Sequence, residues 1–451
     1  MAETRPTEPV RLDGRKLEGG GQLVRIAVAL SALTGQSIAI DHIRGNRSGK
    51  KGLKASHLAA LETLAELSGS RLVKAQVGSC ATEFHPPSYG QGEARRTNTE
   101  INIRLPTPGS VFLVFQALYP YLLRSETADR IRVSIIGGTN VSSSPSYDYV
   151  SQVLIPNFAR VGLPPLSVSL EKRGWSSAPG QEQMGKVLFE IDSLWRAGGG
   201  PPSAVFPSID LRRYQRGTIS QIDITILAPD DRLIAKPNRD ARRHHGYNAE
   251  TDQPETVREF MERQAHRILR KRLKDLPADL FSAGGSEGVS PETGASGAVP
   301  IQTHTTEATR RRSCLYVLIV AHTSTGFRIG RDALYGSLKG EKKPKKRQRK
   351  PEEDMSRRLK DLVDECVKNF IHELNDPRLQ PQKDASGTVR HQPCVDEFMR
   401  DQLVVFEALG RSSDAQESRV GEGHEDERYW SLHTQTAQWV CREMLGEDCL
   451  G

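Results

Sequence analysis

The sequence predicts an α/β fold, within the broader α+β class, in which repeated α/β modules pack as sheets with covering helices. A helical pattern followed by a strand pattern recurs at intervals of roughly 35–50 residues in the first part of the chain. Between about residues 192 and 390 the composition changes, and a compact helical pattern resumes at Cys394. The change predicts a smaller α/β domain with disordered loops, inserted into the first domain.

Four modules support this prediction. The first helix pattern begins at Gln22 and ends at the stop signal Gly35, and an apolar strand pattern follows over residues 36–44. The order of helix and then strand returns three more times, over residues 53–69 with 70–78, 111–123 with 130–136, and 147–162 with 163–174. We therefore expect duplicated modules.

The expected insert holds short strands and two basic helices. Its strand candidates are residues 221–228 and 314–323. The stretch Phe281–Arg312 is rich in Gly, Ser, Thr and Pro, and we expect it to be disordered because it buries little apolar surface. The predicted domains are residues 1–191 and 391–451, which form the first domain, and the insert at 192–390.

Basic residues are concentrated in two blocks. The chain of 451 residues has 63 basic and 56 acidic side chains, a net charge of +7, and much of the excess lies in Arg263–Asp275 and Lys339–Lys350. Such blocks favour polyanions or serve as a nuclear address. For Lys339–Lys350, a solvated surface without a partner is an equal alternative. For Arg263–Asp275 that alternative is favoured, because the spacing suits the polar face of a helix.

Cysteine spacing and hydropathy argue against a zinc-stabilised, a disulfide-stabilised and a membrane-spanning protein. The six cysteines include no CxxC pair, which argues against a structural zinc site and a disulfide framework. No run approaches the roughly 20 apolar residues that a bilayer span needs, and the N-terminus has no apolar signal segment. We expect a soluble intracellular protein without a membrane partner, in the nucleus or, failing that, the cytoplasm.

Three glycines directly precede the first helix pattern. Gly19, Gly20 and Gly21 allow the backbone to approach an anion closely, and a helix N-terminus supplies unpaired N–H groups. A plain turn is the commoner explanation of such a run. Glu18 would suit a hard metal ion if phosphates were bound there.

Several polar side chains could bind a phosphate or a nucleotide. Arg44 and Arg47 follow a strand and can clamp a phosphate, and His57 lies on the next helix. Surface arginines without a ligand remain the commoner case. Gln116 interrupts an apolar helix and needs a partner, which a helix cap or a ligand would supply equally well.

A late histidine is the candidate nucleophile. Ser431 can cap a helix that begins near Leu432, so His433 falls in the first turn. The helix dipole disfavours imidazolium there, which would lower the pKa of His433 and leave a ring nitrogen free to attack. A structural histidine is the commoner alternative.

Six motifs together resemble the RNA 3′-terminal phosphate cyclase family. They occur in family order and cover most of residues 10–190 and 394–445. They are Leu12–Arg25, Ile43–Leu58, Val114–Pro120, Gly137–Tyr149, Arg400–Leu403 and Ser431–Ala437.

The resemblance implies repeated α/β modules, similar to those of enolpyruvyl transferases, with a small insert. It also implies a reaction in three steps. A histidine takes AMP from ATP, and the AMP then passes to an RNA 3′-phosphate. The neighbouring 2′-OH closes a 2′,3′-cyclic phosphate and expels AMP. The implied partners are ATP and an RNA with a 3′-phosphate end, with Mg²⁺ or Mn²⁺ as metal.

Site residues follow from the motifs that match. By resemblance, His433 stands at the nucleophile and Glu18 near the metal. The phosphate and RNA-end residues would be Arg25, Arg44, Arg47 and His57, and the ATP-binding residues Gln116, Phe398, Asp401 and Gln402. Phe398 stands where the family carries an aromatic hydroxyl, so an adenine could stack on it without that hydrogen bond.

Two other functions compete with this one. A non-catalytic cyclase-like protein, acting as a binding module in ribosome biogenesis, is expected to lack the nucleophilic histidine, whereas His433 is present. A sugar-phosphate or enolpyruvyl transferase fits the architecture but not the motifs. The oligomeric state does not follow from the sequence.

Overall fold

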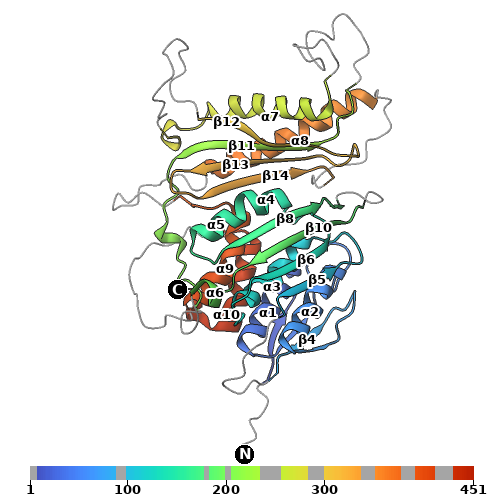
Figure 1. The fold of residues 1–451 in the computed structure, drawn as a ribbon, viewed down its shortest axis with the longest axis vertical. Helices are drawn as coiled ribbons and strands as arrows, with labels where there is room; N and C mark the ends of the chain where they lie inside the picture. The colour runs from blue at the N-terminus through green and yellow to red at the C-terminus, as the bar shows by residue number, and fades with distance from the viewer. Residues whose placement is uncertain are drawn as a thin grey trace, which may run out of the picture. The chain divides into compact units, whose positions relative to one another are not determined.

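The computed structural model describes residues 8–87, 98–176, 182–198, 205–233, 255–282, 299–336, 351–376, 392–411 and 430–450. The chain divides into two compact units. Unit 1 comprises Met1–Ser176, Glu182–Arg213 and Glu397–Gly451, and unit 2 comprises Ser177–Gln181 and Tyr214–Asp396. Mixed sheets with covering helices confirm the predicted α/β class (Figure 1).

The first sheet of unit 1 has the strand order β1-β2-β4-β3. Its elements are β1 (Val10–Asp13), α1 (Gly21–Thr34), β2 (Ile38–Asp41), α2 (Ala55–Ser68), β3 (Arg71–Val73) and β4 (Thr82–His85). The helix predicted from Gln22 is confirmed as α1, and Gly35 ends it with φ 76°. Because β1 and β2 are parallel, α1 is the crossover helix of a βαβ unit.

The second sheet has the order β5-β6-β10-β8. Its elements are β5 (Glu100–Arg104), α3 (Val111–Leu123), β6 (Ile131–Gly137), α4 (Tyr147–Tyr149), η1 (Val150–Leu154), α5 (Ile155–Arg160), β8 (Leu166–Lys172) and β10 (Gly185–Ile191). The fourth predicted helix is thus three consecutive pieces, with a π-helical turn in the middle. Since β5 and β6 are parallel around α3, this sheet repeats the βαβ unit of the first one.

Two helices from the end of the chain pack against the first modules. In Figure 1, α9 (Glu397–Arg411) and α10 (Leu432–Leu445) are red and lie beside the blue and cyan α1 and α3. Ser431 caps α10 as predicted, its Oγ accepting from the Thr434 N–H at 3.0 Å. The remaining elements of unit 1 are β7 (Asn140–Val141), β9 (Trp175–Ser176), α6 (Leu194–Gly198), η2 (Leu211–Arg213) and η7 (Glu447–Cys449).

Unit 2 is one sheet covered by two helices on a single face. The sheet order is β12-β11-β13-β14, from β11 (Ile219–Ala228), β12 (Ile301–Ala308), β13 (Tyr316–Thr323) and β14 (Arg328–Leu334). The helices are α7 (Val257–Leu273) and α8 (Pro351–Leu374), with the short η4 (Ala278–Leu280). Alternate β11 residues, Ile222, Ile224 and Ile226, join one apolar core with both helices. Most of the basic block Arg263–Asp275 lies on α7.

One prediction for the insert was wrong. Residues Ile301–Ala308, inside the stretch expected to be disordered, form β12 and pair in parallel with β11. Exposure alternates along the segment, and three of its eight residues are threonine, which suits a half-buried pleated surface even where large apolar side chains are scarce. Residues 283–298 of that stretch and the run Lys339–Lys350 fall outside the described residues.

Among the described helices, none combines the length and the apolar character that crossing a bilayer requires. All six cysteines are free thiols, and five of them are buried.

Candidate active site

At the start of α1, a Cβ on any of the three glycines would clash with a neighbouring group. A Cβ on Gly19, which has φ 59°, would lie 2.0 Å from the Gly14 carbonyl oxygen. A Cβ on Gly20 would lie 2.2 Å from Glu18 Oε1, and one on Gly21 would lie 2.3 Å from His57 Nε2. The loop therefore brings the side chains of Glu18 and His57 against bare backbone, whereas the predicted approach of this backbone to a bound anion stays a prediction.

Glu18 is buried at the N-terminus of α1, with only 6% of its surface exposed. Its Oε2 accepts from the Gly20 N–H at 2.7 Å, and its Oε1 forms an ion pair with Arg47. The backbone N–H of Glu18 donates to Thr436 Oγ1 of α10 at 3.2 Å. A carboxylate at this end of α1 also has favourable electrostatics, because the helix dipole is positive there.

His433 of α10 contacts Gln22 of α1. His433 Nδ1 and Gln22 Oε1 are 2.6 Å apart, and Gln22 is only 2% exposed. The pKa of His433 is lowered to about 4, chiefly because the ring is partly buried and then because Arg47 and Arg25 lie nearby. The sequence predicted a lowered pKa from the helix dipole, and the structure adds partial burial of the ring and the two arginines as causes.

Gln22 is a site residue that sequence reasoning missed. It directly follows the triglycine run, in the first turn of α1, and it is polar at a position that is fully buried. A buried amide needs a partner. This reasoning pointed to Gln116 in the sequence, and it would have singled out Gln22 as well. The partner, His433, is 411 residues away in the sequence, so no local pattern could identify it.

Cationic side chains gather at the N-termini of α1 and α2. Burial lowers the pKa of Arg25 to about 10, and burial with Arg25, Lys54 and Arg44 lowers the pKa of His57 to about 3. His57 Nδ1 accepts from the Lys54 N–H at 3.2 Å, so His57 is a neutral ring among cations. Arg44 has φ 61°, and its N–H donates to the Gly19 carbonyl at 2.8 Å. The cluster favours a bound anion.

Gln116 finds its partner in this cluster. Its Oε1 accepts from Arg25 Nε at 2.7 Å, a contact that holds the guanidinium between α1 and α3. The partners expected for Gln116 from the sequence were a helix cap or a ligand, and Arg25 was not considered.

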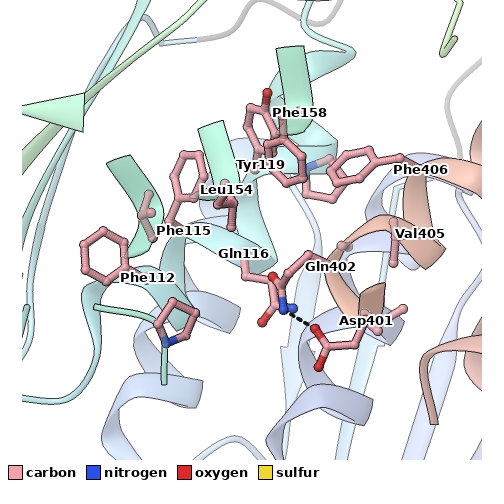
Figure 2. Close-up of a pocket in the computed structure, with 15 residues that line it drawn as sticks. Phe112, Phe115, Gln116, Tyr119, Leu154, Phe158, Asp401, Gln402, Val405 and Phe406 are labelled. Carbon is pink, nitrogen blue, oxygen red and sulfur yellow. Dashed lines mark hydrogen bonds between the residues drawn. The ribbon is translucent and has the colours of Figure 1, made fainter. Parts of the chain in front are cut away.

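A pocket opens beside Gln116 (Figure 2). Asp401 and Gln402 of α9 line it together with Gln116, and a dashed line in the figure marks the hydrogen bond from Gln402 Nε2 to Asp401 Oδ1. Five aromatic side chains also line it: Phe112, Phe115, Tyr119, Phe158 and Phe406. Aromatic walls with a few amide and carboxylate groups suit a flat heterocycle such as a nucleobase.

Phe398 lies apart from these aromatic walls. It is 43% exposed, near the start of α9, and its ring meets the edge of Tyr149 with centroids 6.2 Å apart. It is not among the residues that line the pocket. The structure thus brings together nine of the ten predicted site residues around α1, α2, α3, α9 and α10, with Phe398 at the exposed beginning of α9.

A metal ion would have few protein ligands here. Within the part of the chain that the structure describes, no three His, Cys, Asp or Glu side chains gather to hold one. Glu18 offers a single buried carboxylate beside the cationic cluster. That fits Mg²⁺, which is often held by one or two carboxylates with substrate phosphates and water completing its shell.

Comparison with known proteins identifies the same family. A model of the family described as RNA 3′-terminal phosphate cyclase matches residues 16–449. Curated proteins named RNA 3′-terminal phosphate cyclase are similar to the chain. The one from Desulfurococcus amylolyticus is 41% identical over 154 residues, 34% of this chain and 40% of that protein. The one from Pyrococcus furiosus is 37% identical over 223 residues, 47% of this chain and 62% of that protein. The aligned part is about half the length of such relatives.

Proposed function

Because the chain belongs to the RNA 3′-terminal phosphate cyclase family, we propose that it uses ATP to convert an RNA 3′-terminal phosphate into a 2′,3′-cyclic phosphate. A ring nitrogen of His433 attacks the α-phosphorus of ATP, and the bond to the bridging oxygen breaks as pyrophosphate leaves. An oxygen of the RNA 3′-phosphate then takes the AMP from the imidazole. Finally the 2′-oxygen loses its proton and attacks the same 3′-phosphorus, which expels AMP.

The observation that carries this proposal is the state of His433. The imidazole is uncharged at neutral pH, it is held by Gln22 at 2.6 Å, and arginines lie close to it. A nucleophilic nitrogen needs its lone pair, and nearby cations attract a triphosphate to it. Adenylylation matters because a 3′-phosphate is a poor electrophile for its own 2′-OH until it carries a leaving group, after which closure is intramolecular.

Other side chains have roles in binding. Gln116, Asp401 and Gln402 line a pocket that suits adenine. Phe398 lies outside that lining and is 43% exposed, so its assignment to ATP rests on the family resemblance alone. The cluster of Arg25, Arg44, Arg47 and His57 would bind the phosphates and the RNA end, because guanidiniums pair with phosphate oxygens. The substrate must end in a ribonucleotide, since the 2′-OH is a reactant.

Glu18 would hold a divalent ion, Mg²⁺ or Mn²⁺, together with the phosphates. Such an ion offsets the negative charge that ATP and RNA bring together. Arg47 pairs with Glu18 in the structure, so a bound ion and Arg47 would share that carboxylate. Removal of divalent ions with EDTA should stop the reaction, and added Mg²⁺ or Mn²⁺ should restore it.

The deciding experiment uses ATP labelled at the α-phosphorus. The protein should retain label in an acid-labile phosphoramidate bond, and an RNA 3′-phosphate should chase the label off while it becomes a cyclic phosphate. Absence of label with folded protein would instead favour the non-catalytic, cyclase-like binding module.

We also propose that the protein acts in the nucleus, because of its basic run Lys339–Lys350.

A further inference from the structure

Gln22 occupies a position where folding alone would favour an apolar residue. It is 2% exposed on α1, a helix whose neighbouring positions Leu23 and Ile26 belong to the core. Its Nε2 is buried and has no hydrogen-bond partner among the described residues. An amide group with an unsatisfied donor costs free energy, so its presence points to a role other than stability.

Its Oε1 makes the one contact that explains it. The oxygen lies 2.6 Å from His433 Nδ1. An amide oxygen only accepts hydrogen bonds, so the ring nitrogen that faces it carries a proton. A neutral imidazole holds one proton on its two nitrogens, and therefore Nε2, on the far side of the ring, keeps its lone pair.

We infer that Gln22 is a positioning residue that fixes the tautomer and the direction of His433, so that Nε2 is the attacking nitrogen. This inference rests on the proposed function for its consequence in catalysis. The opposite arrangement, with the amide donating to a bare Nδ1, would leave the proton on Nε2 and remove the nucleophile. The contact is short, and its Gln22 side is buried, which strengthens its hold on the ring.

Three charged groups also face His433 and act on its protonation. Arg25 comes from α1 and Arg47 from the loop after β2, and both disfavour the imidazolium ion. Glu397 at the start of α9 favours it. These groups influence whether the ring is charged. Among the residues that the structure describes, Gln22 makes the directional contact with Nδ1 that distinguishes the two neutral tautomers.

The direct test is the tautomer itself, read from the ¹⁵N chemical shifts of the His433 ring in the whole protein without ATP. The wild type should show a protonated Nδ1 and a bare Nε2 at pH 8. Gln22→Leu should show a mixture of tautomers. A ring with protonated Nε2 in the wild type, or an unchanged tautomer in Gln22→Leu, would overturn the inference.

The kinetic test measures adenylate formation in a single turnover at saturating ATP. Gln22→Leu should slow it by about tenfold or more, because the attacking nitrogen is then protonated or misdirected part of the time. Gln22→Glu should retain the directional contact, but its carboxylate favours imidazolium and should move the pH midpoint of the rate upward. A rate in Gln22→Leu equal to the wild type would contradict the inference.

A matched control comes from unit 2. Gln264 is also 2% exposed, and its Oε1 accepts from Arg267 at 2.6 Å. Gln264→Leu should leave both the tautomer and the adenylation rate unchanged. A similar loss of rate in this variant would mean that replacement of a buried glutamine by leucine lowers the rate by disturbing the fold. If the wild type forms no adenylate, the proposed function fails, and the ¹⁵N measurement still decides the role of Gln22.

Discussion

Glu18 and Thr436, 418 residues apart in the sequence, are joined by a hydrogen bond from the Glu18 N–H to Thr436 Oγ1 at 3.2 Å. The same hydroxyl donates to the Leu432 carbonyl one turn earlier in α10, at 2.8 Å. Thr436 is therefore oriented by its own helix to receive the triglycine loop. This contact and the one between His433 and Gln22 fix the first turn of α10 against the start of α1.

His433→Ala should abolish the labelled adenylate, because no other imidazole replaces the nucleophile. The variant should remain folded, with a thermal midpoint close to that of the wild type. His85→Ala is the control, since His85 is a partly buried histidine of the same unit that contacts Glu83 on β4. If His433→Ala is still labelled by α-labelled ATP, His433 is not the nucleophile.

The pH dependence of adenylation should reflect the depressed pKa of His433, about 4 against an ordinary 6.5. A lowered pKa means that the ring stays unprotonated as the pH falls through 6.5, so the initial rate should hold between pH 8 and about 5.5. It should fall as the pH approaches 4. Initial rates of labelling at saturating ATP would measure this, and a midpoint near 6.5 would contradict the buried, arginine-flanked ring.

Gly21→Ala should reduce activity strongly, because its Cβ would lie 2.3 Å from His57 Nε2 and 2.7 Å from Arg25 Nη1. Displacement of both side chains by about 1 Å is expected to cost about 100-fold in rate. In Gly35→Ala, by contrast, the Cβ meets nothing within 4 Å, although φ is 76°. That control should lose about 1 kcal/mol of stability in urea unfolding and keep its rate. Equal rates in the two variants would refute the steric argument.

Arg44→Ala should weaken the use of RNA 3′-phosphate more than the reaction with ATP. Loss of a charge-assisted contact to a phosphate corresponds to roughly a 10- to 100-fold rise in KM for RNA. Cyclisation with varied RNA would measure that rise, and labelling with ATP alone should stay within about twofold of the wild type. Arg71→Ala, an exposed arginine on β3, should change neither reaction. Equal losses in both reactions of Arg44→Ala would place Arg44 outside the RNA-end site.

Deletion of Lys339–Lys350 should reduce nuclear accumulation if the run is a nuclear address. Fluorescence of the tagged protein in cells would show its distribution. Substitution of the same lysines and arginines by glutamine, at constant length, separates charge from loop length. Unchanged nuclear fluorescence in both variants would argue against the address.

Much of the fold could be predicted where the signal is local. The extent of α1 follows from apolar spacing and the glycine stop, and the start of α10 follows from Ser431. Strands β1 and β5 escaped prediction because they are only four and five residues long, too short for their alternation of apolar and polar residues to stand out. Strand β12 escaped for a related reason: it is held by pairing to β11, which composition does not reveal.

The candidate site was predictable through its motifs and less so through its geometry. The motifs singled out Glu18 and His433, yet the partners that set their properties, Thr436 and Gln22, depend on contacts between the two ends of the chain. Likewise the partner of Gln116 is Arg25 on another helix. Such pairings arise from packing and have no local pattern in the sequence.

The docking of α10 onto α1 also sets an order in time. Ribosomes make α1, α2 and α3 first and must then produce the whole of unit 2 before residue 433 is translated. If His433 is the nucleophile, as proposed, a growing polypeptide cannot take AMP from ATP until α10 has been made. Under the same proposal, termination anywhere in unit 2 would leave a fragment that lacks the nucleophile.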